Sequence, residues 1–411
     1  MNILLINYDF PPNPGIGGRR WAKLAKHLAL KEHRIHVIKS DSPLSPIQST
    51  WLQDVLHPNI QVYSAARKYP SALSHPQKGL VGKIKFHAQK RLMQWREKGT
   101  IYDQSIGWQK TMLPVCREIL KTEKIDAIIA TGAPWNLLVY AAQLKLEFPG
   151  VRLLVDYRDP WLTAKNYGMA ALKDARMKAE IKKQQFVFEQ ADIVTTPYAY
   201  LTKELQDWSN ERCTHQPRFI TLAHFFDSDD LDFGKANASN SNVFSVVYAG
   251  DVYIGSENQW KQFQKLISSL EAKLPSEHRL QLDLYTNAKM PSFISSMKNV
   301  RIHAPIGKNI FHVMSEADAL LIVLPENKRN ERTTKFFEYL PLRKPMLIIA
   351  PRGEVTSFVE EHSLGVHVSQ SEDILTSFFT GDFTKKTFNG QFALQSHTAE
   401  SRANEVISLL S

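Results

Sequence analysis

Short apolar runs alternate along the chain with longer segments in which apolar residues recur every three or four positions. This alternation is typical of parallel βαβ units, in which each buried strand is followed by an amphipathic helix. In the first half, the pattern predicts strands at residues 2–7, 35–39, 61–63, 127–130, 153–156, 193–196 and 219–222. It predicts helices at residues 20–31, 113–122, 137–147 and 170–189. We therefore expect a doubly wound parallel sheet.

A polar run divides the chain into two parts. Residues 227–242 contain few bulky apolar side chains, which is typical of an interdomain linker. The alternation then resumes, and it predicts strands at residues 243–249, 281–285, 300–303, 319–324, 345–350 and 365–368. The sequence thus predicts an α/β protein of two doubly wound, Rossmann-like domains, residues 1–226 and 243–395, that face each other across a cleft. A last helix within residues 396–411 is expected to pack back on the first domain.

Composition narrows the class of protein. The chain has 411 residues, of which 43% are hydrophobic and 22% charged, and these values exclude disordered, collagen-like and coiled-coil proteins. The two cysteines, Cys116 and Cys213, form no CxxC motif and no Cys/His cluster that would suggest zinc. No apolar stretch is long enough to span a membrane, and the opening MNILLINYDFPP is interpreted as a buried strand rather than a signal peptide. We expect a cytoplasmic protein.

The net charge of +10 is concentrated near the N-terminus. Residues 1–200 carry 29 basic and 16 acidic side chains, whereas residues 201–411 carry 22 and 25. Within residues 78–98, seven lysines and arginines face one acid, Glu97, and are interleaved with apolar residues. Such a helix can lie on an anionic membrane, or it can be a solvated helix whose apolar stripe faces the core. No nucleic-acid-binding motif accompanies the segment, so no nucleic-acid partner is expected.

The first motif that carries chemistry follows the first predicted strand and reads NYDFPPNPGIGGRR. Its glycines, Gly15, Gly17 and Gly18, let the backbone approach a ligand closely, and the helix that follows favours anions at its N-terminus. Arg19 and Arg20 add positive charge for a phosphate or carboxylate. A dinucleotide fingerprint fits less well, because the loop is long, contains three prolines and lacks the third glycine at the expected place. The remaining alternative is a glycine-rich turn with surface arginines.

The second motif, DYRDPW, stands at the carboxyl end of a predicted strand. Arg158 and Asp159 could act as an acid, a base or hydrogen-bonding groups for a sugar. A structural ion pair between Arg158 and an aspartate is the alternative.

The third motif is the most informative and reads ERTTKFFEYLPLRKP, from Glu331 onward. Thr333 and Thr334 can cap a helix whose free N–H groups would meet a phosphate, and Lys335 would add a positive charge for a diphosphate. Glu338 lies one turn later and could accept two hydrogen bonds from a ribose diol. A lone glutamate on a helix is more often simply solvated.

The ordered set of segments resembles GT-B glycosyltransferases of family 4 (group 1), the bacterial type that makes surface polysaccharides. The resemblance rests on the opening strand with its glycine-rich turn, DYRDPW, ADIVTTPYAYLTKEL, VVYAGDVY and TTKFFEYLPLRKPML. It implies that residues 1–226 bind the acceptor and residues 243–395 bind a nucleotide-diphosphate sugar. It also implies sugar transfer to a glycan or lipid-linked acceptor with retention of anomeric configuration, with no cofactor and no metal. The expected location is the cytoplasm or the inner face of its membrane.

The resemblance also assigns residues to the site. Arg158 and Asp159 would lie near the reacting centre. Glu338 would bind the ribose, and Lys335 with Thr334 the diphosphate. The other donor-binding residues it implies are Gly17, Gly18, Arg19, Gly250, Ile306, Asn330 and Glu331.

The sequence departs from the family pattern at three places. Asn330 stands where the family has the first of two glutamates eight positions apart, and Glu331 comes one place late. Asp251 follows Gly250, with no arginine or lysine close after it, and no acceptor-domain histidine is evident. These departures leave a catalytically degenerate protein that binds or scaffolds as the alternative. A dinucleotide oxidoreductase is a third hypothesis, and the proline-rich first loop weakens it. One further motif, Asp227-Ser-Asp229, matches a metal-holding pattern but lies among other acids at the linker, so no metal role is expected there.

Overall fold

The computed structural model describes residues 1–13, 16–41, 49, 51–74, 77–164, 167–231, 242–273, 279–368 and 392–411. Most of the predicted linker, and Gly15 of the first motif, lie outside these residues. The chain divides into two compact units. Unit 1 comprises residues 1–223 together with 402–411, and unit 2 comprises residues 224–401.

Unit 1 is built on a seven-stranded parallel sheet. Its strands are β1 (Asn2–Ile6), β2 (Arg34–Ser40), β3 (Ile60–Ala65), β4 (Ala127–Gly132), β5 (Arg152–Tyr157), β6 (Ile193–Thr196) and β7 (Arg218–Thr221). They lie in the order β3-β2-β1-β4-β5-β6-β7, and every adjacent pair is parallel. The chain therefore reverses its direction of travel across the sheet between β1 and β4, which places a topological switch point there.

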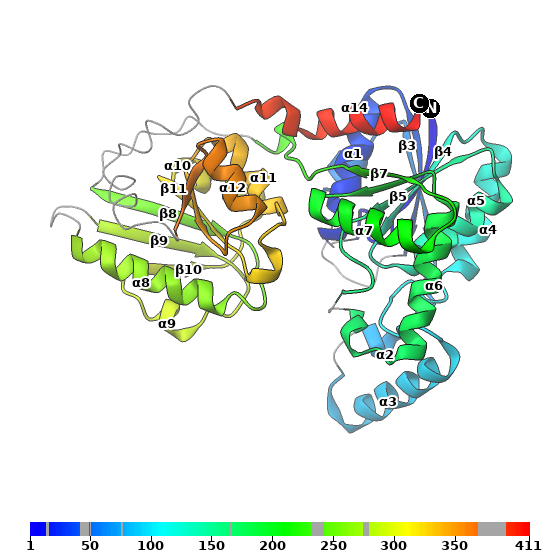
Figure 1. The fold of residues 1–411 in the computed structure, drawn as a ribbon, viewed down its shortest axis with the longest axis horizontal. Coiled ribbons are helices and arrows are strands. Elements are labelled where there is room, and N and C mark those ends of the chain that lie inside the picture. The colour runs from blue at the N-terminus through cyan, green and yellow to red at the C-terminus, as the bar shows by residue number, and fades with distance from the viewer. Residues whose placement is uncertain are drawn as a thin grey trace. The chain divides into compact units, whose positions relative to one another are not determined.

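Helices cover both faces of this sheet. The helices of the unit are α1 (Arg19–Leu30), α2 (Ser71–Ser74), α3 (Gly79–Arg96), α4 (Gln109–Thr122), α5 (Asn136–Glu147), α6 (Asp174–Gln190) and α7 (Ala199–Arg212). Of these, α2 and α3 lie away from the sheet (Figure 1). Since parallel crossovers are right-handed, α1 and α5 lie on opposite faces (Figure 1). The helix predicted at 170–189 begins later than expected, because residues 169–171 form a separate 3₁₀ turn and Leu172 is extended.

Unit 2 repeats the architecture on a six-stranded parallel sheet. Its strands are β8 (Val243–Ala249), β9 (Arg279–Tyr285), β10 (Val300–His303), β11 (Ala319–Val323), β12 (Met346–Ile349) and β13 (Gly365–His367), in the order β10-β9-β8-β11-β12-β13. The helices are α8 (Glu257–Lys273), α9 (Ser292–Ser295), α10 (Ile310–Glu316), α11 (Thr334–Tyr339) and α12 (Glu354–Glu361), before α14 (Ala399–Leu410). Its switch point lies between β8 and β11. The two doubly wound parallel sheets confirm the predicted α/β fold class.

The central strands are buried along their whole length and almost entirely apolar. In β4, β11 and β12 every residue is buried, because helices cover both faces of each sheet. This two-sided burial explains why the strands stand out in the sequence as continuous apolar runs rather than as alternating ones.

The basic segment at 78–98 forms α3, which projects from the body of unit 1 at the end of α6 (Figure 1). Of its side chains, only that of Met93 is buried. The guanidinium of Arg176 on α6 donates to the carbonyls of Gln94, Glu97 and Gly99, and so fixes the C-terminal end of α3. Within the described residues, no helix is both long and apolar enough to cross a membrane.

Asp156, the first residue of DYRDPW, is the acceptor at the centre of a buried hydrogen-bond network in unit 1. Its fully buried carboxylate accepts hydrogen bonds from Arg20 Nε at 3.2 Å, from Trp21 Nε1 at 2.7 Å, and from the hydroxyls of Thr131 and Thr195. Arg20 also donates to the carbonyl of Leu222 at 2.6 Å. The charge of Arg20 therefore serves the fold and does not face a ligand.

We expect Asp156→Ala to lower the free energy of unfolding by about 3 kcal/mol or more, because it removes the buried carboxylate that pairs with Arg20 and accepts from Trp21 and two threonines. Asp159→Ala is the matched control. It removes an exposed carboxylate three residues away and should change stability by less than about 0.5 kcal/mol. Urea denaturation of both variants measures the difference, and equal stabilities would contradict this role for Asp156.

Candidate functional site

The loops that leave β8 and β11 meet at the switch point of unit 2. Gly250 follows β8 directly and has a φ of +103°, a conformation that glycine adopts without strain. A Cβ at Gly250 would lie 2.8 Å from Cε of Lys335, which stands in the first turn of α11. The structure therefore brings these two predicted site residues into contact, and the absence of a side chain at Gly250 makes room for the lysine.

The Lys335 ammonium is the central group of this edge. Only 7% of the residue is exposed, and Nζ donates to the Tyr248 hydroxyl and to the Asp251 carbonyl, both at 2.6 Å. Nζ also lies 4.1 Å from the ring centre of Tyr248 and 5.0 Å from that of Tyr253. Within the described residues, no carboxylate lies within 4.0 Å of it. Burial lowers the pKa of Lys335 to about 7, although the fields of Asp251 and Glu338 oppose the shift.

The other predicted residues of α11 lie around this lysine. Thr333 stands at the N-cap, where its side chain makes no capping hydrogen bond, and Thr334 is the first helical residue. Glu338 is half-buried one turn further on, near enough for its charge to act on both Lys335 and Tyr253. The threonines, the ammonium and the carboxylate thus belong to one short helix at the carboxyl edge of the sheet.

Three further predicted residues of unit 2 have other surroundings. The side-chain oxygen of Asn330 accepts the backbone N–H of Glu354 at 3.2 Å, so it serves the start of α12. The carboxylate of Glu331 pairs with Lys328, whose Nζ also lies 5.5 Å from the ring centre of Tyr253. Ile306 is partly exposed before a 3₁₀ turn at residues 307–309.

The predicted residues of unit 1 gather where β1, β4 and β5 end. The Arg158 guanidinium donates to the carbonyls of Gly17 at 2.7 Å, Gly132 at 3.1 Å and Ala133, and so joins the loops that follow these strands. This arrangement replaces the structural ion pair considered for Arg158. Asp159, next in the chain, is exposed.

The glycine turn itself is closely packed. A Cβ at Gly18 would lie 2.3 Å from the backbone oxygen of Asp9, so the turn requires glycine there. Arg19, the first residue of α1, is buried. The Asp9 carboxylate borders the same turn, and burial raises its pKa against the opposing fields of Arg158 and Arg67.

Solved structures with the same architecture include glycosyltransferases and UDP-GlcNAc 2-epimerases. No protein-family model matches the sequence, and no curated protein is similar to it. Sucrose-phosphate synthase from Thermosynechococcus elongatus superposes with a TM-score of 0.61 at 12% identity, over 100% of this chain and 98% of that one. A glycosyltransferase from Rickettsia africae gives 0.54 at 11% identity, over 100% and 94%. Phytolacca americana UGT2, complexed with UDP-2fluoro-glucose and pterostilbene, gives 0.52 at 12%, over 99% and 94%. The fold is that of the GT-B glycosyltransferases.

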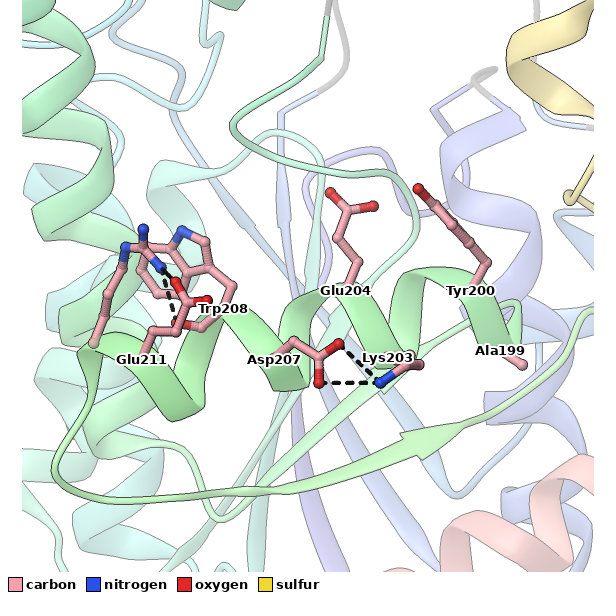
Figure 2. A pocket seen from close by; sticks show the side chains of 8 residues that line it. Ala199, Tyr200, Lys203, Glu204, Asp207, Trp208 and Glu211 are labelled. Atoms are coloured by element: carbon pink, nitrogen blue, oxygen red, sulfur yellow. Dashed lines mark hydrogen bonds and ion pairs between the residues drawn. The ribbon is translucent and has the colours of Figure 1, made fainter.

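One hollow of this GT-B protein contains no predicted catalytic or binding residue. A hollow of about 630 Å³ lies along α7 and is lined by Ala199, Tyr200, Lys203, Glu204, Asp207, Trp208, Glu211 and Arg212 (Figure 2). Its lysine pairs with Asp207 at 2.9 Å, and its arginine pairs with Glu211 and lies over the Trp208 ring. These charges therefore compensate one another along the helix, and none of the predicted site residues lines the hollow.

In the part of the chain that the structure describes, no group of three or more histidines, cysteines or acids is arranged to hold a metal ion. The Asp227 carboxylate of the Asp-x-Asp motif instead accepts the backbone N–H of Asp229 in a 3₁₀ turn.

The aromatic and basic residues that surround Lys335 are not among the site residues predicted from the sequence. Tyr248 and Tyr253 belong to the quoted segment VVYAGDVY, and their rings flank the ammonium. Their position just before and after a glycine at a strand end is the signal that could have found them. Lys328 gave no such signal, because only the fold of the loop after β11 brings it to Tyr253.

Proposed function

We propose that this chain is a nucleotide-sugar-dependent glycosyltransferase of the hexosyltransferase type, in which unit 2 binds the donor and unit 1 binds the acceptor. The observation that carries the proposal is the buried Lys335 ammonium at the switch point of unit 2, which has neutral partners and no carboxylate within 4.0 Å among the described residues. A buried cation is normally paired. The diphosphate of a nucleotide sugar would supply the missing negative charge, at the sheet edge where doubly wound folds bind ligands.

Sugar transfer requires the site to help one bond break and one bond form. The bond between the anomeric carbon and the diphosphate oxygen breaks, the acceptor oxygen bonds to that carbon, and the acceptor proton leaves with the diphosphate or to solvent. Lys335 and the N–H groups near Thr334 would stabilise the charge that develops on the diphosphate. Glu338 would accept hydrogen bonds from the ribose. Following the family resemblance, we propose retention of configuration and a role in surface polysaccharide synthesis, with Asp159 near the reacting centre and Arg158 positioning its loops.

Binding and turnover test the proposal separately. Calorimetric titration of the full-length protein with UDP, GDP, ADP, CMP and NAD⁺ should give binding by one nucleoside diphosphate, and Glu338→Gln should weaken it. Release of free nucleotide from the matching nucleotide sugar, measured with a mixed glycan and polyprenyl-phosphate acceptor panel, should then show turnover. Binding without turnover across that panel would favour a degenerate binding protein. Binding of NAD⁺ alone would overturn the proposal.

The exposed face of α3 supports a peripheral membrane contact. Leu80, Val81, Ile84 and Trp95 are 75%, 81%, 60% and 83% exposed, so the apolar stripe does not face the core. Around the helix axis, where successive residues are about 100° apart, these four residues and Leu92 lie within an arc of about 120°. Lysines flank this arc and the exposed Arg91 lies within it, so cations and apolar side chains share a face that could rest on an anionic bilayer.

We expect the protein to bind vesicles that contain phosphatidylglycerol and to leave neutral phosphatidylcholine vesicles unbound at moderate salt. Binding should shift the emission of tryptophan to shorter wavelength, and Trp95→Ala should remove most of that shift because Trp95 is the most exposed of the stripe. Co-sedimentation measures the bound fraction. Replacing Lys83 and Lys85 with glutamine should weaken binding by about 1 kcal/mol per lysine. Equal binding to both vesicle types would contradict an electrostatic contact.

A further inference from the structure

The described residues contain three buried lysines, and they differ in their partners. Lys23 is fully buried and pairs with Asp54 at 2.8 Å. Lys335 has neutral partners at the edge of unit 2. Lys39 is 4% exposed, and within the described residues no carboxylate lies within 4.0 Å of its ammonium. Unit 1 thus contains a second buried cation that the proposed donor site does not explain.

The partners of Lys39 are all neutral. Its Nζ donates to the carbonyl of Ser40 at 2.8 Å and to the side-chain oxygen of Asn13 at 3.4 Å. Burial lowers the pKa of Lys39, the nearby Arg67 lowers it further, and Asp41 opposes both. The site therefore holds positive charge at an energetic cost that an anion would offset.

Arg67 provides a second cation at the same edge. It follows β3 by two residues, and β3 pairs with β2 so that Lys39 is opposite Ser64. Its Nε donates to the backbone oxygen of Asp41 at 2.8 Å and lies 3.9 Å from the half-exposed carboxylate of the same residue, and its guanidinium lies 5.0 Å from the ring centre of Tyr8. The Arg67 side chain is 25% exposed, so part of the fork remains accessible. The planar fork of a guanidinium can donate two hydrogen bonds to the oxygens of a phosphate or a carboxylate.

The position of this pair points to the acceptor. The carboxyl ends of β1, β2 and β3 are neighbours in the sheet, and Arg67 is near enough to Asp9, beside the glycine turn, to influence its pKa. The donor diphosphate is assigned to the corresponding edge of unit 2. The resemblance brings only the glycine turn after β1 to the donor, so we assign an anion at the ends of β2 and β3 to the other substrate.

We propose that unit 1 binds an acceptor that carries an oxyanion, a phosphate or a carboxylate, and that Arg67 and Lys39 are its ligands. This inference rests on the proposed function, because it takes unit 1 as the acceptor side. It names the chemical class of the acceptor, which the donor-site observations leave open.

Equilibrium binding of matched sugars to the full-length protein tests it without any donor. Glucose 6-phosphate and glucuronate serve as the anionic probes, and glucose is the neutral control. We expect at least one anionic sugar to bind about tenfold more tightly than glucose. Preference for the phosphate or for the carboxylate identifies which oxyanion the site takes, and either preference supports the proposal.

Variants show whether the named residues are responsible. Arg67→Gln should bring the anionic sugar to within about twofold of glucose. The matched control, Lys68→Gln, removes the exposed charge next in the chain and should keep the preference. Lys39→Met, with its fold checked by circular dichroism, should also lose it. Lys335→Met should keep it even if donor binding is lost, which separates failure of this proposal from failure of the donor assignment. Equal binding of the three sugars, no binding of any, or an unchanged preference in both Arg67→Gln and Lys39→Met would overturn it.

Discussion

Replacing Lys335 with methionine should raise the dissociation constant for the nucleoside diphosphate by roughly 100-fold, since losing one partner of a buried charge pair costs about 2–5 kcal/mol. The same change should leave the free energy of unfolding unchanged or higher. In the free protein the ammonium is desolvated without a counter-ion, and a methionine of similar length removes that cost. The Tyr248 hydroxyl would still donate to the Asp251 carbonyl at 2.6 Å, so no polar group is left unpaired by the change.

Calorimetric titration and urea denaturation measure the two effects on the same variant. Lys261→Met is the control, because it removes an exposed lysine of unit 2 that pairs with Glu257 along α8. It should change neither binding nor stability by more than about 0.5 kcal/mol. A residue that served only the fold would give the opposite result, with lower stability in Lys335→Met and unchanged affinity for the nucleotide.

The affinity for the nucleoside diphosphate should fall as the pH rises above 7. The pKa of Lys335 in the free protein is about 7, so above that value the lysine is mainly neutral and must take up a proton when the diphosphate binds. The dissociation constant should therefore rise by up to about tenfold per pH unit above 7, and Lys335 should add little dependence below it. Titration in buffers with different enthalpies of ionisation would detect the proton uptake directly.

Lys335 should make the stability of the free protein rise with pH, whereas it makes the affinity for the nucleotide fall. In the unfolded chain the lysine keeps its ordinary pKa of 10.5, so between pH 7 and that value the unfolded state binds more protons than the folded state. Under these conditions the free energy of unfolding rises with pH. The contribution of Lys335 is the difference between the native protein and Lys335→Met, since other groups titrate in both. Parallel pH profiles of the two proteins, in stability and in affinity, would contradict a depressed pKa at this position.

The fold could be predicted from the sequence because its central strands are buried on both faces. The runs in β4 and β11 have no polar alternation, and continuous apolar runs separated by helical segments leave a parallel sheet as the simplest arrangement. The residues at which helices begin were harder to predict from the sequence. Residues 169–171 have helical composition but form a separate 3₁₀ turn, and only tertiary contacts decide that α6 begins at Asp174.

For the candidate site, the sequence could predict individual residues at strand ends but not the contacts that those residues make. Gly250 and Lys335 were both singled out, and the structure places them in contact. The partners that a polar group chooses depend on loop geometry, which no local pattern encodes. Asn330 is engaged by the start of α12, and Arg158 by three backbone carbonyls. Lys39 gave no signal at all, because a lysine at a strand end is usually solvated.

The division of the chain has a consequence for the order of events during synthesis. Residues 402–411 belong to unit 1, so the whole of unit 2 is inserted between two parts of unit 1. On the ribosome, unit 2 can therefore be completed before unit 1, although unit 1 begins first. A premature stop codon just before residue 402 would spare every residue of unit 2 and remove the buried side chains of Ala403, Val406 and Leu410 from unit 1.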